Sequence, residues 1–326
     1  MTINASTPNR RQWLLSAVAT AAAASTSARA DTVVQDLSWH DSARQRELSL
    51  RVRWPAGAGA AALVVHSHGL GGSRQGGELW GRAWQQAGFV VLHLQHPGSD
   101  SEVLREGVTA LRRAANGQQL VDRALDVAFV LDQVDRLRSD ASSPWARCAR
   151  QRIGVAGHSF GAITTLAIAG QRFPAGARLA DPRPAAFIAL SPGAPNGLQP
   201  LQTTYGGIVR PTLVMTGSHD GDPFGSHTSG EPRARVFDGL PPGDRGLLWL
   251  EGADHMSFSG NTRAMRARAG LLRRHEDAVA REAEHQQAII AASLLWWRAH
   301  LLADASSRAA LRAGPALVPG DRWSHG

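Results

Sequence analysis

The stretch RIGVAGHSFGAITTL, residues 152–166, places a serine between two glycines where an apolar run ends and a helical pattern begins. Its centre, GHSFG, matches G-x-S-x-G, in which the serine occupies a sharp turn between a strand and a helix. Gly157 and Gly161 leave room for that turn, and the helix expected at 162–169 points its N-terminal dipole at Ser159. An ordinary tight turn has the same local sequence, so the remainder of the chain must distinguish the two interpretations.

Strand-like and helix-like segments alternate on both sides of this stretch. Residues 61–68, AALVVHSH, form a continuous apolar run typical of a strand buried on both faces. Residues 78–88 repeat apolar side chains at helical spacing and end on a glycine. The same reasoning predicts further strands at 46–54, 89–94, 152–157, 185–190, 211–217 and 245–252, and further helices at 119–137 and 286–302. Strands separated by helices predict an α/β fold with a mostly parallel sheet covered by helices on both faces.

Three parts of the chain do not fit this alternation: residues 97–117, the tail after about 305, and the first thirty residues. We expect residues 97–117 to be an irregular excursion over the edge of the sheet, and the tail after about 305 to be weakly packed. At the N-terminus, Arg10-Arg11 precede an Ala-rich apolar run that ends on the A-x-A sequence at 28–30. This pattern is similar to a twin-arginine signal peptide, so we expect residues 1–30 to be a leader and 31–326 a single domain of a bacterial periplasmic or secreted protein.

Composition and charge narrow the classes of partner. The formal net charge is +8, of which three leader arginines contribute +3, and the chain contains no lysine. The arginines are scattered and do not form a basic stripe interleaved with aromatic residues, so we expect no nucleic-acid partner. No later segment is long and apolar enough for a stable membrane anchor. The single cysteine, Cys148, excludes an internal disulfide framework.

A serine nucleophile needs a base and an acid, which follow it in the order serine, acid, histidine on this type of elbow. Downstream of Ser159, the predicted strand at 211–217 is followed by Asp220 and Asp222, and the strand at 245–252 is followed by His255. We predict Ser159, Asp220 and His255 as a catalytic triad, with Asp222 as the alternative acid on the same loop. Asp254 is expected to be a loop or capping residue.

The negative charge that develops on a carbonyl oxygen during attack needs hydrogen-bond donors. One candidate is the backbone N–H of Phe160, directly after the nucleophile. The other should come from the loop HSHGLGGSRQ, residues 66–75, whose glycines allow close approach of the backbone. We assign the second donor to the N–H of Leu70.

Five segments together carry a resemblance to a known family: SHGLGGSR, HPGSD, GHSFGA, MTGSHDGDP and DHMSF. In this order, over residues 48–302, they resemble the α/β-hydrolase family of predicted dienelactone hydrolases and platelet-activating-factor acetylhydrolase-like enzymes, and more distantly cutinase-type polyester hydrolases. The resemblance implies an α/β-hydrolase fold and a carboxylic-ester hydrolase with Ser159, Asp220 and His255 as its triad. Dienelactone hydrolases themselves use a cysteine nucleophile, so the serine indicates a different ester.

We therefore expect a serine esterase that acts on a small-molecule or polymeric ester through an acyl-enzyme. Acyltransfer, perhydrolysis and non-catalytic binding on the same scaffold are the alternatives; the sequence does not indicate an oligomeric state. The thirteen histidines raise the question of a metal site. His66, His68, His93 and His96 lack a neighbouring cluster of carboxylates or cysteines, so we predict no metal and no cofactor. We expect His66, His68 and His96 at the rim of the pocket or bonded to backbone groups.

Overall fold

The computed structural model describes residues 32–326 except 175, 196, 223–227 and 263–273. The predicted leader therefore lies outside the described residues. By the contacts between its residues, the chain from 31 to 326 forms one compact unit. No helix in the described part of the chain has both the length and the hydropathy needed to cross a bilayer.

The described residues form a nine-stranded sheet with the order β1-β2-β4-β3-β5-β6-β7-β8-β9. Pairing is parallel from β4 to β8, whereas β1, β2 and β9 join it as antiparallel strands. The chain is thus α/β with a mostly parallel sheet, as predicted. The strands are β1 (Val33–Asp41), β2 (Arg46–Trp54), β3 (Ala61–Ser67), β4 (Val90–Leu94), β5 (Cys148–His158), β6 (Ala186–Leu190), β7 (Thr212–His219), β8 (Arg245–Asp254) and β9 (Arg322–His325).

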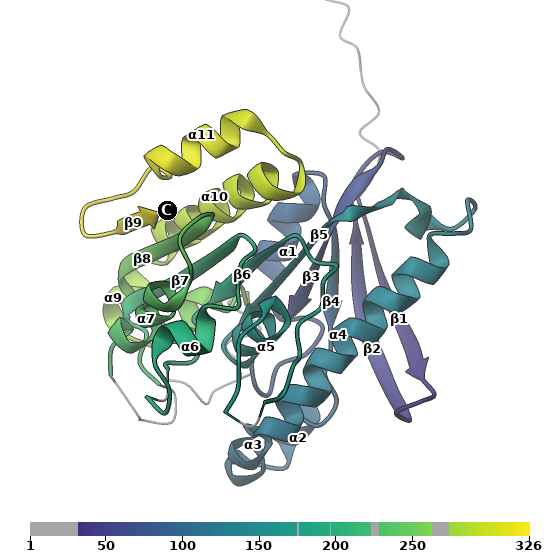
Figure 1. The fold of residues 1–326 in the computed structure, drawn as a ribbon, viewed down its shortest axis with the longest axis horizontal. Helices are drawn as coiled ribbons and strands as arrows, with labels where there is room; N and C mark the ends of the chain where they lie inside the picture. Colours follow the sequence, from purple (N-terminus) through teal and green to yellow (C-terminus); the bar gives the residue numbers. More distant parts are fainter. Residues whose placement is uncertain (1–31, 175, 196, 223–227, 263–273) are drawn as a thin grey trace, which may run out of the picture. The chain divides into compact units, whose positions relative to one another are not determined.

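Helices cover both faces of this sheet (Figure 1). Alternate residues of the central strands face opposite sides, so two apolar cores form, one against α4, α5 and α7 and the other against α1, α10 and α11. The helices are α1 (Glu78–Gln86), α2 (Ser101–Arg105), α3 (Val108–Ala114), α4 (Gly117–Leu137), α5 (Phe160–Ala169), α6 (Leu201–Tyr205), α7 (Glu231–Gly239), α9 (Glu276–Ala280), α10 (Glu282–Leu301) and α11 (Ala305–Ala313), with 3₁₀ turns η1 (Pro144–Arg147) and η2 (His255–Phe258).

The parallel pairing brings the carboxyl ends of six strands to one edge. Ser67 of β3 lies opposite Gly157 of β5, and the next pair, β5 and β6, ends on His158 opposite Leu190. His219 of β7 lies opposite Asp254 of β8. In parallel α/β sheets this edge is where ligand-binding and catalytic side chains collect, and the loops that leave it carry Ser159, Asp220 and His255.

Two expectations about local structure are wrong. Residues 97–117 are not irregular throughout, because they contain α2 and α3; Asp100 caps α2 by accepting a hydrogen bond from the Glu102 N–H. The tail after 305 is not weakly packed. It forms α11, which buries Leu311, and β9, which pairs with β8 and is the edge strand of the sheet. The Trp323 indole N–H donates to the Leu311 carbonyl at 2.8 Å and so ties β9 to α11.

Candidate active site

The turn between β5 and α5 holds Ser159 in a strained backbone conformation. Its φ of 56° and ψ of −117° lie outside the regions that a residue with a side chain normally adopts. Gly157 and Gly161 permit this turn: a Cβ on Gly157 would lie 2.2 Å from the Gly161 carbonyl oxygen, and one on Gly161 would lie 2.0 Å from that of Ser67. Ser159 is also the residue that precedes α5, so its side chain sits at the positive end of the helix.

We expect Gly161→Ala to destabilise the fold by about 3 kcal/mol, because the added methyl group meets backbone rather than a movable side chain. The matched control is Gly59→Ala, in a loop where an added Cβ has no heavy atom within 4 Å. Urea unfolding of both variants measures the difference. Equal unfolding free energies would contradict the close packing of α5 against the end of β3.

His255 follows β8 and faces the serine. Its Nε2 lies 3.0 Å from the Ser159 hydroxyl oxygen, within hydrogen-bond distance. The neighbouring Asp254 turns away and caps η2, since its carboxylate accepts from the Ser257 N–H at 2.9 Å and from Arg274 Nε at 2.9 Å. The expectation that Asp254 is a capping residue is therefore confirmed.

Asp220 follows β7 and lies on the other side of the imidazole. Its Oδ1 is 2.9 Å from His255 Nδ1, so Ser159, His255 and Asp220 form one continuous hydrogen-bonded chain. Asp220 is fully buried, whereas Asp222, on the same loop, is half-buried. Of the two predicted acids, the one whose carboxylate is within hydrogen-bond distance of His255 Nδ1 is Asp220.

Three side chains that the sequence analysis did not single out complete the surroundings of Asp220. Ser191, directly after β6, donates to Oδ1 at 2.8 Å, and Thr216 donates to Oδ2 at 2.8 Å. Arg233 of α7 places its Nε 3.1 Å from Oδ1. Burial by itself would raise the pKa of Asp220, but the Arg233 charge and the bonds from His255 and Ser191 outweigh it and lower the pKa. The carboxylate is therefore held in its charged form.

The loop after β3 lies against the nucleophile. A Cβ on Gly69 would lie 3.3 Å from the Cβ of Ser159, so the backbone of this loop touches the elbow. The Leu70 side chain packs with Phe160 in one small apolar cluster. Within the described part of the chain, no backbone hydrogen bond uses the N–H of Leu70 or of Phe160. Both N–H groups thus lack a backbone partner in this part of the chain, and their role as the oxyanion donors stays a prediction.

The buried His68 fixes the orientation of the Leu70 N–H. Its Nε2 accepts from the His96 backbone N–H at 3.0 Å, so the proton of the neutral ring resides on Nδ1, which donates to the Gly69 carbonyl oxygen at 2.7 Å. Burial lowers the pKa of His68 well below its ordinary value, which keeps the ring in this neutral form. Because C=O and N–H of a trans peptide point in opposite directions, holding the Gly69 carbonyl also aims the Leu70 N–H.

Comparison with known proteins adds no family to this geometry. No protein-family model matches the chain, and no curated protein matches it either. The chemistry of the site therefore has to be inferred from the positions of its own atoms.

The histidines beside the site are buried rather than at a pocket rim, so that part of the expectation is wrong. His66, His68 and His96 are each at most 2% exposed. The expectation of bonds to backbone groups holds for His68, whose ring bonds the Gly69 carbonyl and the His96 N–H, but not for His96, whose ring bonds the side chains of Ser67 and Asp126. His158, which directly precedes the nucleophile, donates through Nε2 to the His255 carbonyl oxygen at 3.0 Å and so helps to hold the base in place.

One group of described side chains has the composition of a metal site. The possible ligand atoms of His219, His275 and Asp277 all lie within 4.8 Å of one another. The two imidazole rings, however, are stacked, with centroids 3.6 Å apart and 16° between their planes. A ring nitrogen binds a metal in the plane of its ring, and two nearly parallel planes do not meet at one ion. This arrangement is that of two stacked imidazoles beside one shared carboxylate, and it does not suit a metal centre.

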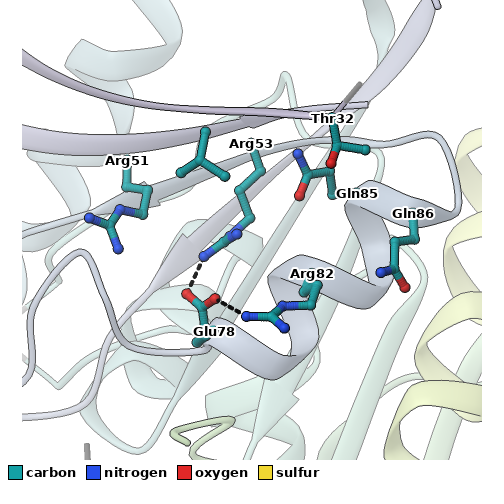
Figure 2. A pocket seen from close by; sticks show the side chains of 8 residues that line it. Thr32, Arg51, Arg53, Glu78, Arg82, Gln85 and Gln86 are labelled. Atoms are coloured by element: carbon teal, nitrogen blue, oxygen red, sulfur yellow. Dashed lines mark hydrogen bonds and ion pairs between the residues drawn. The ribbon is translucent and has the colours of Figure 1, made fainter. Parts of the chain in front are cut away.

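A hollow of about 480 Å³ lies between β2 and α1, separated from β5 by β4 and β3 in the sheet. Figure 2 shows Arg53 and Arg82 pointing at Glu78, and both are bonded to it. A third arginine of the hollow, Arg51, is paired with Asp36 at 2.8 Å. Because the charged side chains that line it are paired within the protein, this hollow offers no unpaired charge to a ligand, and it is separate from the Ser159 site.

Proposed function

We propose that the protein is a serine-dependent carboxylic-ester hydrolase built on an α/β-hydrolase fold. The observation that carries the proposal is the hydrogen-bonded chain from Ser159 Oγ through His255 to Asp220, at 3.0 and 2.9 Å. Its members follow β5, β8 and β7, and the nucleophile occupies a strained strand–turn–helix elbow. This combination of chain order, elbow and hydrogen bonds is the arrangement that serine hydrolases use.

In the proposed mechanism His255 Nε2 accepts the Ser159 proton while the serine oxygen attacks the ester carbonyl carbon. The carbonyl oxygen becomes an oxyanion, which the N–H groups of Leu70 and Phe160 stabilise. Collapse of this intermediate breaks the bond to the alcohol oxygen, which takes the proton from His255. Water then attacks the acyl-enzyme by the same steps, releasing the carboxylic acid and regenerating the serine.

Asp220 supports both halves of this cycle. Its carboxylate accepts from His255 Nδ1–H, so Nε2 is left free to take the serine proton. When the imidazole becomes positively charged, the nearby buried carboxylate stabilises it electrostatically. The bonds from Ser191, Thr216 and Arg233 keep the carboxylate ionised and fixed in place.

A fluorophosphonate probe tests this proposal, because it forms a stable covalent bond only with a serine that an adjacent base activates. We expect stoichiometric labelling of the native protein, with the added mass on the tryptic peptide that contains Ser159. Protein denatured before exposure is the control and should remain unlabelled, because unfolding separates Ser159 from His255.

Native protein that resists the probe and does not hydrolyse a short p-nitrophenyl ester would contradict the proposal. That result would favour a non-catalytic binding protein on the same scaffold. Labelled protein that transfers its acyl group to an added alcohol or to peroxide faster than to water would instead indicate an acyltransferase or a perhydrolase.

A further inference from the structure

Helix α4 carries an arginine whose guanidinium is completely buried beneath the loop after β3. The Arg123 Nε donates to the Thr164 hydroxyl at 3.0 Å, and Nη1 donates to the Ser99 hydroxyl at 2.9 Å. Its Nη2 donates both to the Ser67 hydroxyl, at 3.0 Å, and to the His68 carbonyl oxygen. Four of its five N–H groups are thus used by partners that lie around the nucleophile elbow.

The partners of this guanidinium are unusual for a buried cation. They are three hydroxyl groups and one carbonyl, and among the described residues no carboxylate is hydrogen-bonded to Arg123. The nearest acid on α4, Asp126, is itself bonded to Arg46 at 2.9 Å and to His96 at 3.0 Å. Burial lowers the pKa of Arg123 to about 9, and the side chain is therefore still charged at neutral pH. Burying such a charge is costly, which argues for a specific role.

One set of contacts reaches the loop that carries the Leu70 N–H. The His68 carbonyl, which Arg123 binds directly, belongs to the peptide that precedes Gly69. Arg123 also binds the hydroxyl of Ser99. The carbonyl oxygen of Ser99 in turn accepts a hydrogen bond from the Gly71 N–H at 2.9 Å. Arg123 therefore holds this loop on both sides of Leu70.

A second set of contacts reaches the residue that carries the other donor. The Arg123 Cζ lies 4.7 Å from the centroid of the Phe160 ring, a cation–π distance. Thr164, which accepts from Arg123 Nε, donates in turn to the Phe160 carbonyl oxygen at 2.9 Å. The same guanidinium thus fixes the first turn of α5 as well as the loop after β3.

We propose that Arg123 is a positioning residue that sets the spacing of the two oxyanion donors, the N–H groups of Leu70 and Phe160. This inference rests on the proposed esterase function. The two donors lie on different elements, and the Arg123 side chain contacts both of these elements. Oxyanion stabilisation depends steeply on geometry, so a small change in this spacing is costly to the transition state.

The test compares an ester with the matching thionoester, whose sulfur accepts hydrogen bonds weakly. When the Leu70 and Phe160 N–H groups are correctly placed, the enzyme hydrolyses the oxygen ester faster than the thionoester. When either N–H group is displaced, this preference for the oxygen ester becomes smaller. Arg123→Lys keeps the positive charge but loses the planar set of N–H donors. We expect it to lower kcat/KM for the ester by about 10- to 100-fold, mainly in kcat. The thionoester should lose much less, so the preference for oxygen shrinks. Thr164→Val should shift the preference in the same direction by roughly 5-fold.

Thr165→Val is the matched control for the second variant. Both threonines are fully buried in α5 and bond the carbonyl four residues earlier at 2.9 Å, but only Thr164 contacts Arg123. We expect Thr165→Val to keep the wild-type preference. If Arg123→Lys fails to fold, Thr164→Val against Thr165→Val decides the question. An unchanged oxygen preference in Thr164→Val, with an active wild type, overturns the inference; an inactive wild type overturns the proposed function and this inference with it.

Discussion

Ser159→Ala is expected to lower kcat for a p-nitrophenyl ester by about 10⁴- to 10⁶-fold while leaving the protein folded. The loss is large because the hydroxyl oxygen forms the bond to the substrate, and no neighbouring group can replace it. The fold should tolerate the change because the hydroxyl bonds only the His255 imidazole among the described contacts, and alanine has the same Cβ at the strained φ of 56°. Stopped assays at high enzyme concentration, with a melting curve for each protein, measure both effects.

Ser139→Ala is the matched control for this substitution. Ser139 is exposed at the end of α4, where its hydroxyl bonds the Asp135 carbonyl at 3.3 Å. We expect wild-type kinetics from this variant. Turnover in Ser159→Ala within a factor of ten of the wild type would remove Ser159 as the nucleophile, even if the variant melts at the same temperature.

The parts of the site that could be predicted are those that local sequence determines. The glycines two residues on each side of Ser159 leave room for a sharp turn of the nucleophile-elbow type, and this pattern is visible without the rest of the chain. The positions of Asp220 and His255 could be inferred because parallel strands bring their carboxyl ends to one edge. Predicting the order of the strands was not necessary for this, since each candidate follows its own strand.

The residues that could not be predicted act through partners distant in sequence. Arg233 reaches Asp220 from α7, and Ser191 reaches both Asp220 and His255 from the end of β6. A serine after a strand or an arginine in a helix is common, so neither carries a signal before the fold places it. The same holds for β9, whose four residues become a strand only because the edge of β8 offers backbone partners.

Asp220→Asn is expected to lower kcat by about 10³- to 10⁴-fold. An amide that presents its NH₂ group to His255 Nδ1 favours the imidazole tautomer with the proton on Nε2, which cannot accept the Ser159 proton. The variant should also unfold more easily, by about 1 to 3 kcal/mol, because the buried Arg233 loses its charged partner. Three backbone carbonyls, those of Asp220, Pro192 and Gly221, still accept from Arg233 and limit this cost.

The pH dependence of unfolding separates these two effects of Asp220. Its pKa in the folded protein lies below the usual value of 3.8, so its contribution to stability is complete above that pH and is lost as the pH falls through the lower folded value. Asp220→Asn should remove this part of the acid sensitivity, and Asp222→Asn, on the same loop, should retain it together with most of the activity. A loss of kcat in Asp222→Asn equal to that in Asp220→Asn would show that the acid had been wrongly assigned, because only one carboxylate can bind His255 Nδ1 at 2.9 Å.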